Sequence, residues 1–507
     1  MVEPEILLGP PGTGKTTSLL EIVDEELANG VHPSRIAYLS FTRRAAEEAI
    51  SRACTKFSGC SRSDFPYFRT LHSLCFRLMG LTSSGILEGR RLEEFGKRVG
   101  YRITGKFSLE DGTMFGFERG DRLLFMENLA RVRGVPLRSV YDEDHDDLSF
   151  HEVDRFARTL AEYKAEMGIV DFTDMLSQFV ESGTPPEIDV LIVDEAQDLS
   201  QMQWRVVRRL ADGARRFVIA GDDDQAIYRW AGADVETLIT MAGDTRVLSQ
   251  SYRVPRAVQR LAGSIISRVH HRREKIWRPR DSDGELQHHA TDESIDLSGP
   301  DILVLGRNRY VLREFENKIR ALGYLYEFQG AQSIRPSVLG AVLTWERLRQ
   351  GRPGISASDC RKMYDLMSSG HGVARGHKTL PRFGEEEEVT IEALHERGGL
   401  QVPRDRLWYD ALDKLSGTDV SYIRAARRRG ETFASSPRIR LSTIHGMKGG
   451  EARQVVLLTD MATRTYQESL RSPEDEARVW YVGATRARES LHIVSPQTTR
   501  FYKMPGG

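Results

Sequence analysis

The sequence predicts an α/β fold with two parallel-sheet cores, each carrying a mostly helical insertion. One observation is a glycine-rich turn at residues 9–14, which follows an apolar strand-like run and precedes a helical pattern. Another is a set of apolar runs rich in β-branched residues, typical of buried parallel strands, at residues 190–193, 217–220, 302–305 and 455–458. The two later runs indicate a second core, because 507 residues exceed what one core holds.

Composition limits the classes of function. The 72 Lys and Arg residues nearly balance the 73 Asp and Glu residues, so any nucleic-acid site must be local. The 4 cysteines lack C-x-x-C spacing, which argues against a zinc site and a disulfide framework. No apolar run approaches the roughly 18 residues of a membrane helix, and no signal peptide is recognisable. We therefore expect a cytoplasmic protein with no membrane partner.

The glycine-rich turn fits the phosphate-binding pattern G-x-x-x-x-G-K-[ST] without a mismatch. Its backbone N–H groups can face phosphate oxygens, Lys15 adds a positive charge, and the Thr16 hydroxyl can bind Mg²⁺. The helical pattern after Lys15 would point its N-terminus at the anion. The sequence thus predicts a nucleoside triphosphate site, formed by Gly9, Pro10, Pro11, Gly12, Thr13, Gly14, Lys15, Thr16 and Thr17.

The next segments predict a second strand–helix unit and then a helical insertion. Residues 36–41 form a strand-like run, which places Phe41 and Thr42 at the carboxyl end of a parallel strand, where open α/β sheets bind ligands. Thr70 and His72 precede another apolar helix, and for His72 a core role is as well supported as a binding role. Between residues 81 and 167 the strand–helix alternation lapses, which indicates the insertion.

Two polar groups follow the buried runs of the first core. Asp194 and Glu195 end the run at 190–193; beside a phosphate loop, Asp194 is predicted to hold Mg²⁺ and Glu195 to activate the attacking water. A helix N-cap at Asp198 would explain only one of the acids there. Gln225 follows the run at 217–220 and can contact both a γ-phosphate oxygen and water.

Tyr228 and Trp230 stand just after Gln225. Aromatic residues at this spacing are more often core than ligand-binding. Their position beside a phosphate sensor supports a second interpretation, in which nucleic-acid bases stack on them, each stack contributing ~1–3 kcal/mol.

The ordered motifs resemble those of UvrD-like superfamily 1 DNA helicases. The first half contains Gly-Pro-Pro-Gly-Thr-Gly-Lys-Thr, Leu-Ser-Phe-Thr, Thr-Leu-His-Ser, Val-Asp-Glu-Ala-Gln-Asp and Gly-Asp-Asp-Asp-Gln-Ala-Ile-Tyr-Arg-Trp. The second half contains Gln-Ser-Tyr-Arg at 250–253, Thr-Ile-His-Gly-Met-Lys-Gly-Gly-Glu at 443–451 and Tyr-Val-Gly-Ala-Thr-Arg-Ala at 481–487. The resemblance spans nearly the whole chain, and so many motifs in family order are far more specific than a phosphate loop alone.

The resemblance implies a domain organisation. Two RecA-like domains are expected, 1A at residues 1–80 with 168–243 and 2A at residues 244–340 with 436–507. Their insertions would be 1B at 81–167 and a short 2B at 341–435, and ATP with Mg²⁺ would bind between 1A and 2A. No appended nuclease or zinc domain is expected after residue 494.

The resemblance also implies residue roles. Arg253 and Arg486 would reach the γ-phosphate beside the catalytic set Lys15, Asp194, Glu195 and Gln225, while Tyr252 and Glu451 would contact the nucleotide. Single-stranded DNA would stack on Phe41, Tyr228 and Trp230, with Thr70, His72, Thr443 and His445 near its backbone. The expected activity is ATP-driven 3′-to-5′ movement with duplex unwinding at single-strand/double-strand junctions, in a bacterial or phage-infected cell, with replication or repair proteins as partners.

Two alternatives and two basic clusters stay open at this point. The chain could be a nucleotide-gated DNA-binding switch that does not unwind, or a motor that acts on RNA. Arginine and lysine residues gather at 268–280 and at 424–429. The first cluster fits salt-dependent contact with a nucleic-acid backbone and a solvated helix face equally well.

Overall fold

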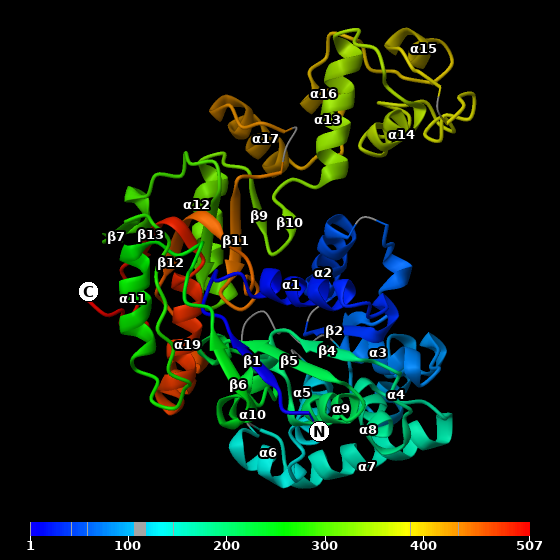
Figure 1. Cartoon of the computed structure of the whole chain (residues 1–507). Coiled ribbons are helices and arrows are strands. Elements are labelled where there is room, and N and C mark those ends of the chain that lie inside the picture. The colour runs from blue at the N-terminus through cyan, green and yellow to red at the C-terminus, as the bar shows by residue number, and fades with distance from the viewer. Residues whose placement is uncertain are drawn as a thin grey trace. The chain divides into compact units, whose positions relative to one another are not determined.

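The computed structural model describes residues 2–41, 43–57, 59–105, 118–145, 147–385, 387–433 and 436–506 (Figure 1). Thr42, expected at the end of a strand, lies outside these residues. The chain divides into two compact units, Met1–Ala290 with Thr443–Gly507, and Thr291–Ser442. The sites discussed below all lie in the first unit. The division of the chain into domains 1A, 1B, 2A and 2B remains a prediction.

A parallel sheet forms the centre of the first unit. Its strand order is β3 (Phe68–Thr70), β2 (Ile36–Ser40), β4 (Val190–Val193), β5 (Arg216–Gly221), β1 (Glu5–Leu8) and β6 (Asp244–Val247). The paired strands all run parallel, with Tyr38 opposite Ile192 and Val193 opposite Ile219. This arrangement confirms the predicted α/β class. Because β6 pairs with β1, the sheet continues past the expected domain boundary at residue 243.

The alternation of side chains along each strand builds an apolar core on each face of the sheet. Leu191 and Val193 pack with α3 (Leu71–Leu78), α8 (Phe172–Ser182) and α9 (Gln201–Ala211). Val190 and Ile192 point the other way, into the core with α1 (Lys15–Ala28) and α2 (Arg43–Lys56). Burial on both faces explains why these strands read as continuous apolar runs rather than alternating ones.

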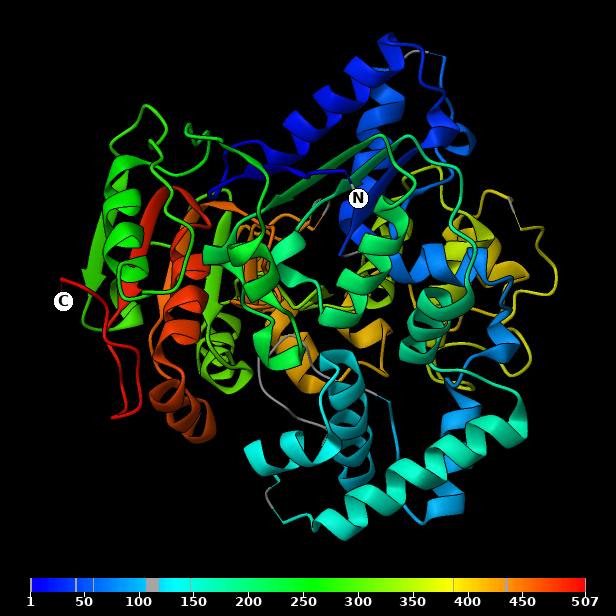
Figure 2. The ribbon, with the colours of Figure 1, turned by 60° about the horizontal axis from the view of Figure 1, so that its bottom comes forward.

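Helices occupy the segment that the sequence assigns to the first insertion (Figure 2). They are α4 (Arg90–Val99), α5 (Arg119–Arg133), α6 (Leu137–Glu143) and α7 (Phe150–Met167). Phe95, Leu123, Phe156 and Leu160 belong to a core of their own, separate from the two sheet cores. The segment therefore has its own hydrophobic interior.

The remaining part of the first unit contains a second set of parallel strands, β12 (Ala452–Leu458), β13 (Ala487–Val494) and β7 (Glu285–His289), in that order. The helices of this part are α11 (Arg256–Ile266), α18 (Thr463–Arg471) and α19 (Pro473–Ala484), whereas α10 (Val235–Thr240) packs into the core of the first sheet through Leu238. Helix α19 is buried from Glu476 to its last residue, Ala484. It ends just before Arg486, so burial of the helix fixes the position of that residue.

The second unit joins a small sheet to a group of helices. Its strands are β8 (Ile302–Gly306), β11 (Ile439–Thr443), β9 (Tyr326–Phe328) and β10 (Ala331–Gln332), ordered β10-β9-β11-β8, with β9 parallel to β11 and antiparallel to β10. The helices are α12 (Arg309–Ala321), α13 (Pro336–Arg349), α14 (Ala357–Asp365), α15 (Ile391–Glu396), α16 (Trp408–Ala411) and α17 (Gly417–Arg429). Within the described part of the chain, none of the helices is long and apolar enough to cross a membrane.

Candidate nucleotide site and nucleic-acid interface

The phosphate-loop sequence forms the turn between β1 and α1. Gly12 and Gly14 have left-handed backbone angles, φ 72° and 81°, which glycine adopts without strain. Gly12 is also needed for space, since a Cβ atom there would lie 2.3 Å from the Cβ atom of Arg253. Lys15 Nζ donates a hydrogen bond of 2.9 Å to the carbonyl oxygen of Gly9. The lysine therefore folds back over the loop.

A cavity of about 460 Å³ opens beside this loop. It gathers residues that are far apart in the sequence but that the motifs predicted to act together. Its lining includes Pro10, Pro11, Gly12, Thr13, Gly14, Lys15, Thr16, Thr17, Asp194, Glu195, Gln225, Tyr252, Arg253, Glu451 and Arg486. Tyr252 is 72% exposed, and its backbone N–H donates to the carbonyl oxygen of Gly12. The segment that contains Tyr252 and Arg253 is thus bonded directly to the phosphate loop.

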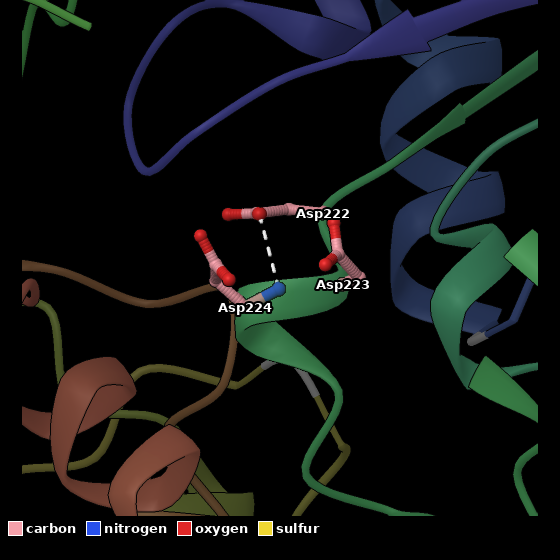
Figure 3. A group of neighbouring side chains, drawn as sticks. All are labelled: Asp222, Asp223 and Asp224. Carbon is pink, nitrogen blue, oxygen red and sulfur yellow. Dashed lines mark hydrogen bonds between the residues drawn. The ribbon is translucent and has the colours of Figure 1, made fainter. Parts of the chain in front are cut away.

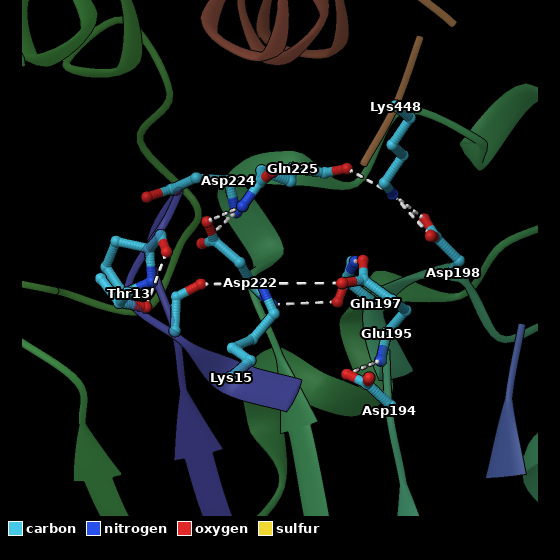
Figure 4. Close-up of polar contacts among 12 residues, drawn as sticks. Thr13, Lys15, Asp194, Glu195, Gln197, Asp198, Asp222, Asp224, Gln225 and Lys448 are labelled. Carbon is cyan, nitrogen blue, oxygen red and sulfur yellow. Dashed lines mark hydrogen bonds and ion pairs between the residues drawn. The ribbon is translucent and has the colours of Figure 1, made fainter. Parts of the chain in front are cut away.

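The acidic pair lies at the carboxyl end of β4 (Figure 4). Asp194 is 3% exposed and accepts a hydrogen bond of 2.7 Å from the Tyr38 hydroxyl, which also interacts with Thr16. Burial, together with the charge of Glu195, raises the pKa of Asp194. Burial alone would raise the pKa of Glu195 too, but the positive charges of Lys15 and Lys448 outweigh it and hold that pKa below its usual range. Lys15 Nζ lies 3.7 Å from a Glu195 oxygen.

Gln225 connects two parts of the site. Its side-chain oxygen accepts a 2.9 Å hydrogen bond from Arg486, and its side-chain nitrogen donates a 2.6 Å bond to Asp222. Arg486 is 1% exposed, and burial lowers its pKa to about 9. Arg253 donates to Glu451 over 2.5 Å. Both arginines implied by the motifs therefore line the same cavity as the phosphate loop.

Sequence reasoning missed the ion pair of Lys448 with Asp198. Lys448 Nζ lies 2.6 and 2.5 Å from the two Asp198 oxygens and 2.8 Å from the carbonyl oxygen of Gln225. Burial raises the pKa of Asp198 to about 6. The N-cap alternative for Asp198 is wrong, since Ser200 caps α9. The one signal for this pair in the sequence was Asp198, a charged residue just after a buried strand. Nothing in the sequence indicated that Lys448 is its partner.

Three consecutive carboxylates, Asp222, Asp223 and Asp224, lie close enough together to hold a cation (Figure 3). The Lys275 ammonium fills this position, at 3.3 Å from Asp222 and 3.2 Å from Asp224 and also bonded to Asp223. Arg272 donates to Asp224 over 2.7 Å. The cluster is therefore an internal ion network rather than a metal site.

This network also resolves part of the basic cluster at 268–280. Arg272 and Lys275 are engaged by buried carboxylates, and Arg273 donates to the carbonyl oxygens of Ile239 and Met241. These side chains bind the protein itself, so neither proposed reading, backbone contact or solvated face, describes them. Arginines of the second cluster lie over aromatic rings: Arg424 is 4.9 Å from the ring centre of Tyr409 and Arg429 is 3.4 Å from that of Tyr324.

The aromatic residues expected to bind DNA lie near one another. The rings of Phe41 and Tyr228 are stacked at 5.7 Å, and Lys448 Nζ lies 5.0 Å from the centre of the Tyr228 ring. Trp230 is half-buried and stacks on Phe125 of α5 at 6.4 Å. Both interpretations of these aromatics therefore keep support, since the rings contact the protein and retain exposed surface.

The polar residues expected near the DNA backbone are less exposed. Thr70 caps α3 by accepting from the Ser73 backbone N–H over 3.2 Å. His72 packs edge-on against Phe172, and burial lowers its pKa to about 4. Thr443 and His445 are 0% and 2% exposed. Cavities of about 620 and 640 Å³ lie beside Phe41 and His72, so this region can admit a ligand, whereas contact of Thr443 and His445 with DNA stays a prediction.

Comparison with known proteins identifies similar sequences along most of the chain. A model of the UvrD/REP helicase N-terminal domain matches residues 2–90 and 126–246. A model of the UvrD-like helicase C-terminal domain matches residues 438–494. Together the two models cover slightly more than half of the chain. They contain every motif residue described above except the segment around Tyr252 and Arg253.

Individual relatives are distant. The ATP-dependent DNA helicase PcrA of Bacillus subtilis is 24% identical over 68% of this chain and 48% of that protein. The ATP-dependent DNA helicase Rep of Escherichia coli is 22% identical over 98% of this chain and 91% of that protein. A solved complex of the arterivirus nonstructural protein 10 helicase with DNA shares 10% identity with a TM-score of 0.34, covering 98% of this chain and 62% of that one. The chain spans less than half the length of the PcrA relatives.

Proposed function

Since the chain belongs to the UvrD-like superfamily 1 helicases, we propose that it is an ATP-dependent DNA helicase. In this proposal it hydrolyses ATP to move along single-stranded DNA in the 3′-to-5′ direction and unwinds duplex DNA at single-strand/double-strand junctions. The observation that carries the proposal is the convergence of the phosphate loop, the Asp194–Glu195 pair, Gln225 and two arginines on one cavity of about 460 Å³.

The proposed chemistry begins with the phosphates. Backbone N–H groups of residues 12–16 and the N-terminus of α1 bind the phosphate oxygens, and Lys15 leaves the Gly9 carbonyl to contact them. The Tyr38 hydroxyl contacts both the buried Asp194 carboxylate and Thr16, so these two residues lie close together. A carboxylate and a hydroxyl are oxygen ligands that fit a magnesium ion. Bound Mg²⁺ would neutralise charge on the transferred phosphoryl group.

Glu195 is the proposed base that orients and deprotonates the attacking water, since its carboxylate stays ionised beside Lys15. Gln225 would contact the γ-phosphate and the water. Arg253 and Arg486 would stabilise charge that develops in the transition state, and such an arginine contributes roughly 10³–10⁵ in rate. Gln225 and Arg486 already share a hydrogen bond, so they can respond to the γ-phosphate as a pair.

DNA coupling is proposed to run through Lys448. This side chain bonds to Asp198 and to the Gln225 carbonyl on the nucleotide side, and it lies over the Tyr228 ring on the proposed DNA side. A change at Gln225 is therefore one contact away from a base-stacking residue. Bases would stack on Phe41, Tyr228 and Trp230, and stacking accepts any base, as movement along DNA of any sequence requires.

The decisive experiment combines ATP hydrolysis and strand displacement with the purified chain. We expect single-stranded DNA to stimulate hydrolysis, and labelled strands to be displaced from partial duplexes with ATP but not with a non-hydrolysable analogue. Stimulated hydrolysis without displacement would favour the DNA-binding switch. Stronger stimulation by RNA than by DNA would favour an RNA motor, and hydrolysis that ignores both nucleic acids would contradict the proposal.

A further inference from the structure

Gln197 lies between the proposed base and the loop that carries Gln225 (Figure 4). It follows Glu195 in η4 (Ala196–Asp198) and is 0% exposed. Its Nε2 donates a 2.6 Å hydrogen bond to Glu195 Oε2, and its Oε1 accepts a 2.9 Å bond from the backbone N–H of Asp222. One buried amide thus joins the carboxyl ends of β4 and β5.

The chemistry of these partners fixes the orientation of the amide. A backbone N–H can only donate, so the oxygen of Gln197 must face Asp222. The NH₂ group must then face Glu195, which as a carboxylate can only accept. A hydrogen bond to an ionised acceptor is stronger than one between neutral groups. Gln197 therefore fixes the position of one Glu195 oxygen through a directional contact.

The strand beside Gln197 leaves room for this contact. A Cβ atom on Gly221 would lie 2.8 Å from Gln197 Oε1. Gly221 does not have a left-handed backbone, so the need for glycine here is spatial rather than conformational. The missing Cβ atom of Gly221 thus lets β5 come close enough to the amide for the hydrogen bond to Asp222 to form.

The conformation of Glu195 requires contacts that hold it in place. It is one of the few non-glycine residues with a left-handed backbone among those described, at φ 54°, and such a residue persists only when its surroundings hold it. Two described groups contact its carboxylate, Lys15 and Gln197. In the proposed function Lys15 turns to the phosphates, which leaves the Gln197 amide to hold the carboxylate.

The same amide ties Glu195 to the sensor loop. The backbone N–H of Asp222 donates to Gln197, while the Asp222 carboxylate accepts from Gln225 and lies beside Lys275. The geometry points to Gln197 as a positioning residue for ATP hydrolysis: it holds the Glu195 carboxylate in the orientation that activates water and links it to the Asp222–Gln225 loop. This inference rests on the proposed function, in which Glu195 is the base.

The test separates orientation of the base from nucleotide binding. Gln197→Met keeps the size of the side chain but removes both hydrogen bonds, and Gln197→Glu turns an oxygen toward Glu195. We expect each to lower DNA-stimulated kcat by about 10- to 100-fold, the range for a misplaced catalytic group. Affinity for a fluorescent non-hydrolysable ATP analogue should stay within about twofold, because phosphate contacts remain.

A second variant perturbs the same contact independently, and a control substitutes a glutamine outside the site. Gly221→Ala crowds the Gln197 oxygen without changing its chemistry, and we expect a loss of kcat in the same direction. Gln259→Met is the control, because this half-buried glutamine on α11 also bonds a backbone group, donating to the carbonyl oxygen of Trp277, but lies outside the nucleotide cavity. Its kcat should match the wild type.

The inference is overturned if folded Gln197→Met and Gln197→Glu proteins keep kcat within about twofold of the wild type, or if kcat falls only in proportion to lost nucleotide affinity. If Gln197→Met does not fold, Gly221→Ala decides by the same criteria. A wild-type protein that fails to hydrolyse ATP would instead contradict the proposed function, so the two failures are distinguishable.

Discussion

At the scale of the residue, buried charges in the first unit are stabilised by specific partners. Lys275 has a fully buried side chain among the carboxylates of Asp222, Asp223 and Asp224. Its burial alone would lower the pKa of the ammonium, but the three carboxylates outweigh burial and raise it. The lysine therefore stays charged, and each carboxylate depends on it.

Removing this ammonium should be costly. We predict that Lys275→Met lowers the free energy of unfolding by about 3–5 kcal/mol, because it leaves uncompensated carboxylates in the interior. Urea unfolding followed by circular dichroism measures this. Lys56→Met is the control: Lys56 lies 3.4 Å from Asp24 on the surface, and its loss should change stability by less than about 1 kcal/mol. Equal effects of the two substitutions would contradict the internal role of Lys275.

Glu195 allows a test of the proposed base by a single-atom change. Glu195→Gln keeps the shape of the side chain but removes its ability to take a proton. We predict that ATP binding persists while DNA-stimulated kcat falls by about 10²-fold or more. Equilibrium binding of a fluorescent ATP analogue and steady-state hydrolysis supply the two readings. Hydrolysis at the parental rate would show that another residue activates water.

His72 should make stability depend on pH. Burial lowers its pKa in the folded protein to about 4, whereas an unfolded chain titrates near 6.5. Between these values the unfolded state binds a proton that the folded state does not, so stability falls as the pH drops from 6.5 to 4. We expect the free energy of unfolding, measured with urea, to fall between pH 7 and pH 4.5 by about 1–2 kcal/mol less in His72→Asn than in the wild type. An unchanged pH dependence would show that the ring is solvated.

At the scale of the element, the strands were predictable and the contacts between them were not. The run at 190–193 was identifiable because burial on both faces leaves no polar position in it. The motif residues Asp194 and Gln225 were identifiable because they follow such runs. The contacts of Lys448 with Asp198, of Lys275 with Asp223 and of Gln197 with Asp222 were missed because they join distant segments, and one sequence does not show which loops meet at a sheet edge.

Strand pairing also shows a strand that the sequence did not predict. Asp244–Val247 has an exposed, polar face and carries no apolar pattern, so the sequence gives no sign of a strand there. Its hydrogen bonds to β1 make it an edge strand of the first sheet. The surroundings of Trp230 were likewise not predictable, since α5 supplies the Phe125 ring beside it.

Trp230 tests how these elements serve DNA. We predict that Trp230→Ala weakens binding of single-stranded DNA by about 10-fold, since one stacked base contributes ~1–3 kcal/mol. Its melting temperature should fall less than that of Trp345→Ala, because Trp345 is 0% exposed while Trp230 is only half-buried. Fluorescence anisotropy with labelled DNA and thermal unfolding give the two values. Unchanged DNA affinity with a large fall in melting temperature would assign Trp230 to the core.

At the scale of the whole molecule, nucleotide and DNA functions are proposed to share the first unit. The cavity beside the phosphate loop and the Phe41–Tyr228 stack both lie in Met1–Ala290 with Thr443–Gly507. The net charge of −1 means that DNA affinity must come from such local contacts rather than from bulk attraction. Affinity should therefore depend on the stacking residues more than on the overall charge.

Direction of travel is a property of the whole molecule that no single contact sets, and the proposed direction is 3′-to-5′. We predict that the chain unwinds duplexes with a 3′ single-stranded tail at least about 10-fold faster than those with a 5′ tail, because only a 3′ tail lets a 3′-to-5′ motor run into the duplex. Strand displacement under single-turnover conditions measures both rates. Glu195→Gln, which should bind ATP without hydrolysing it, controls for strand melting by binding alone. Faster unwinding of the 5′-tailed substrate would reverse the proposed direction, and equal rates on tailed and blunt duplexes would show that single-stranded DNA is not the track.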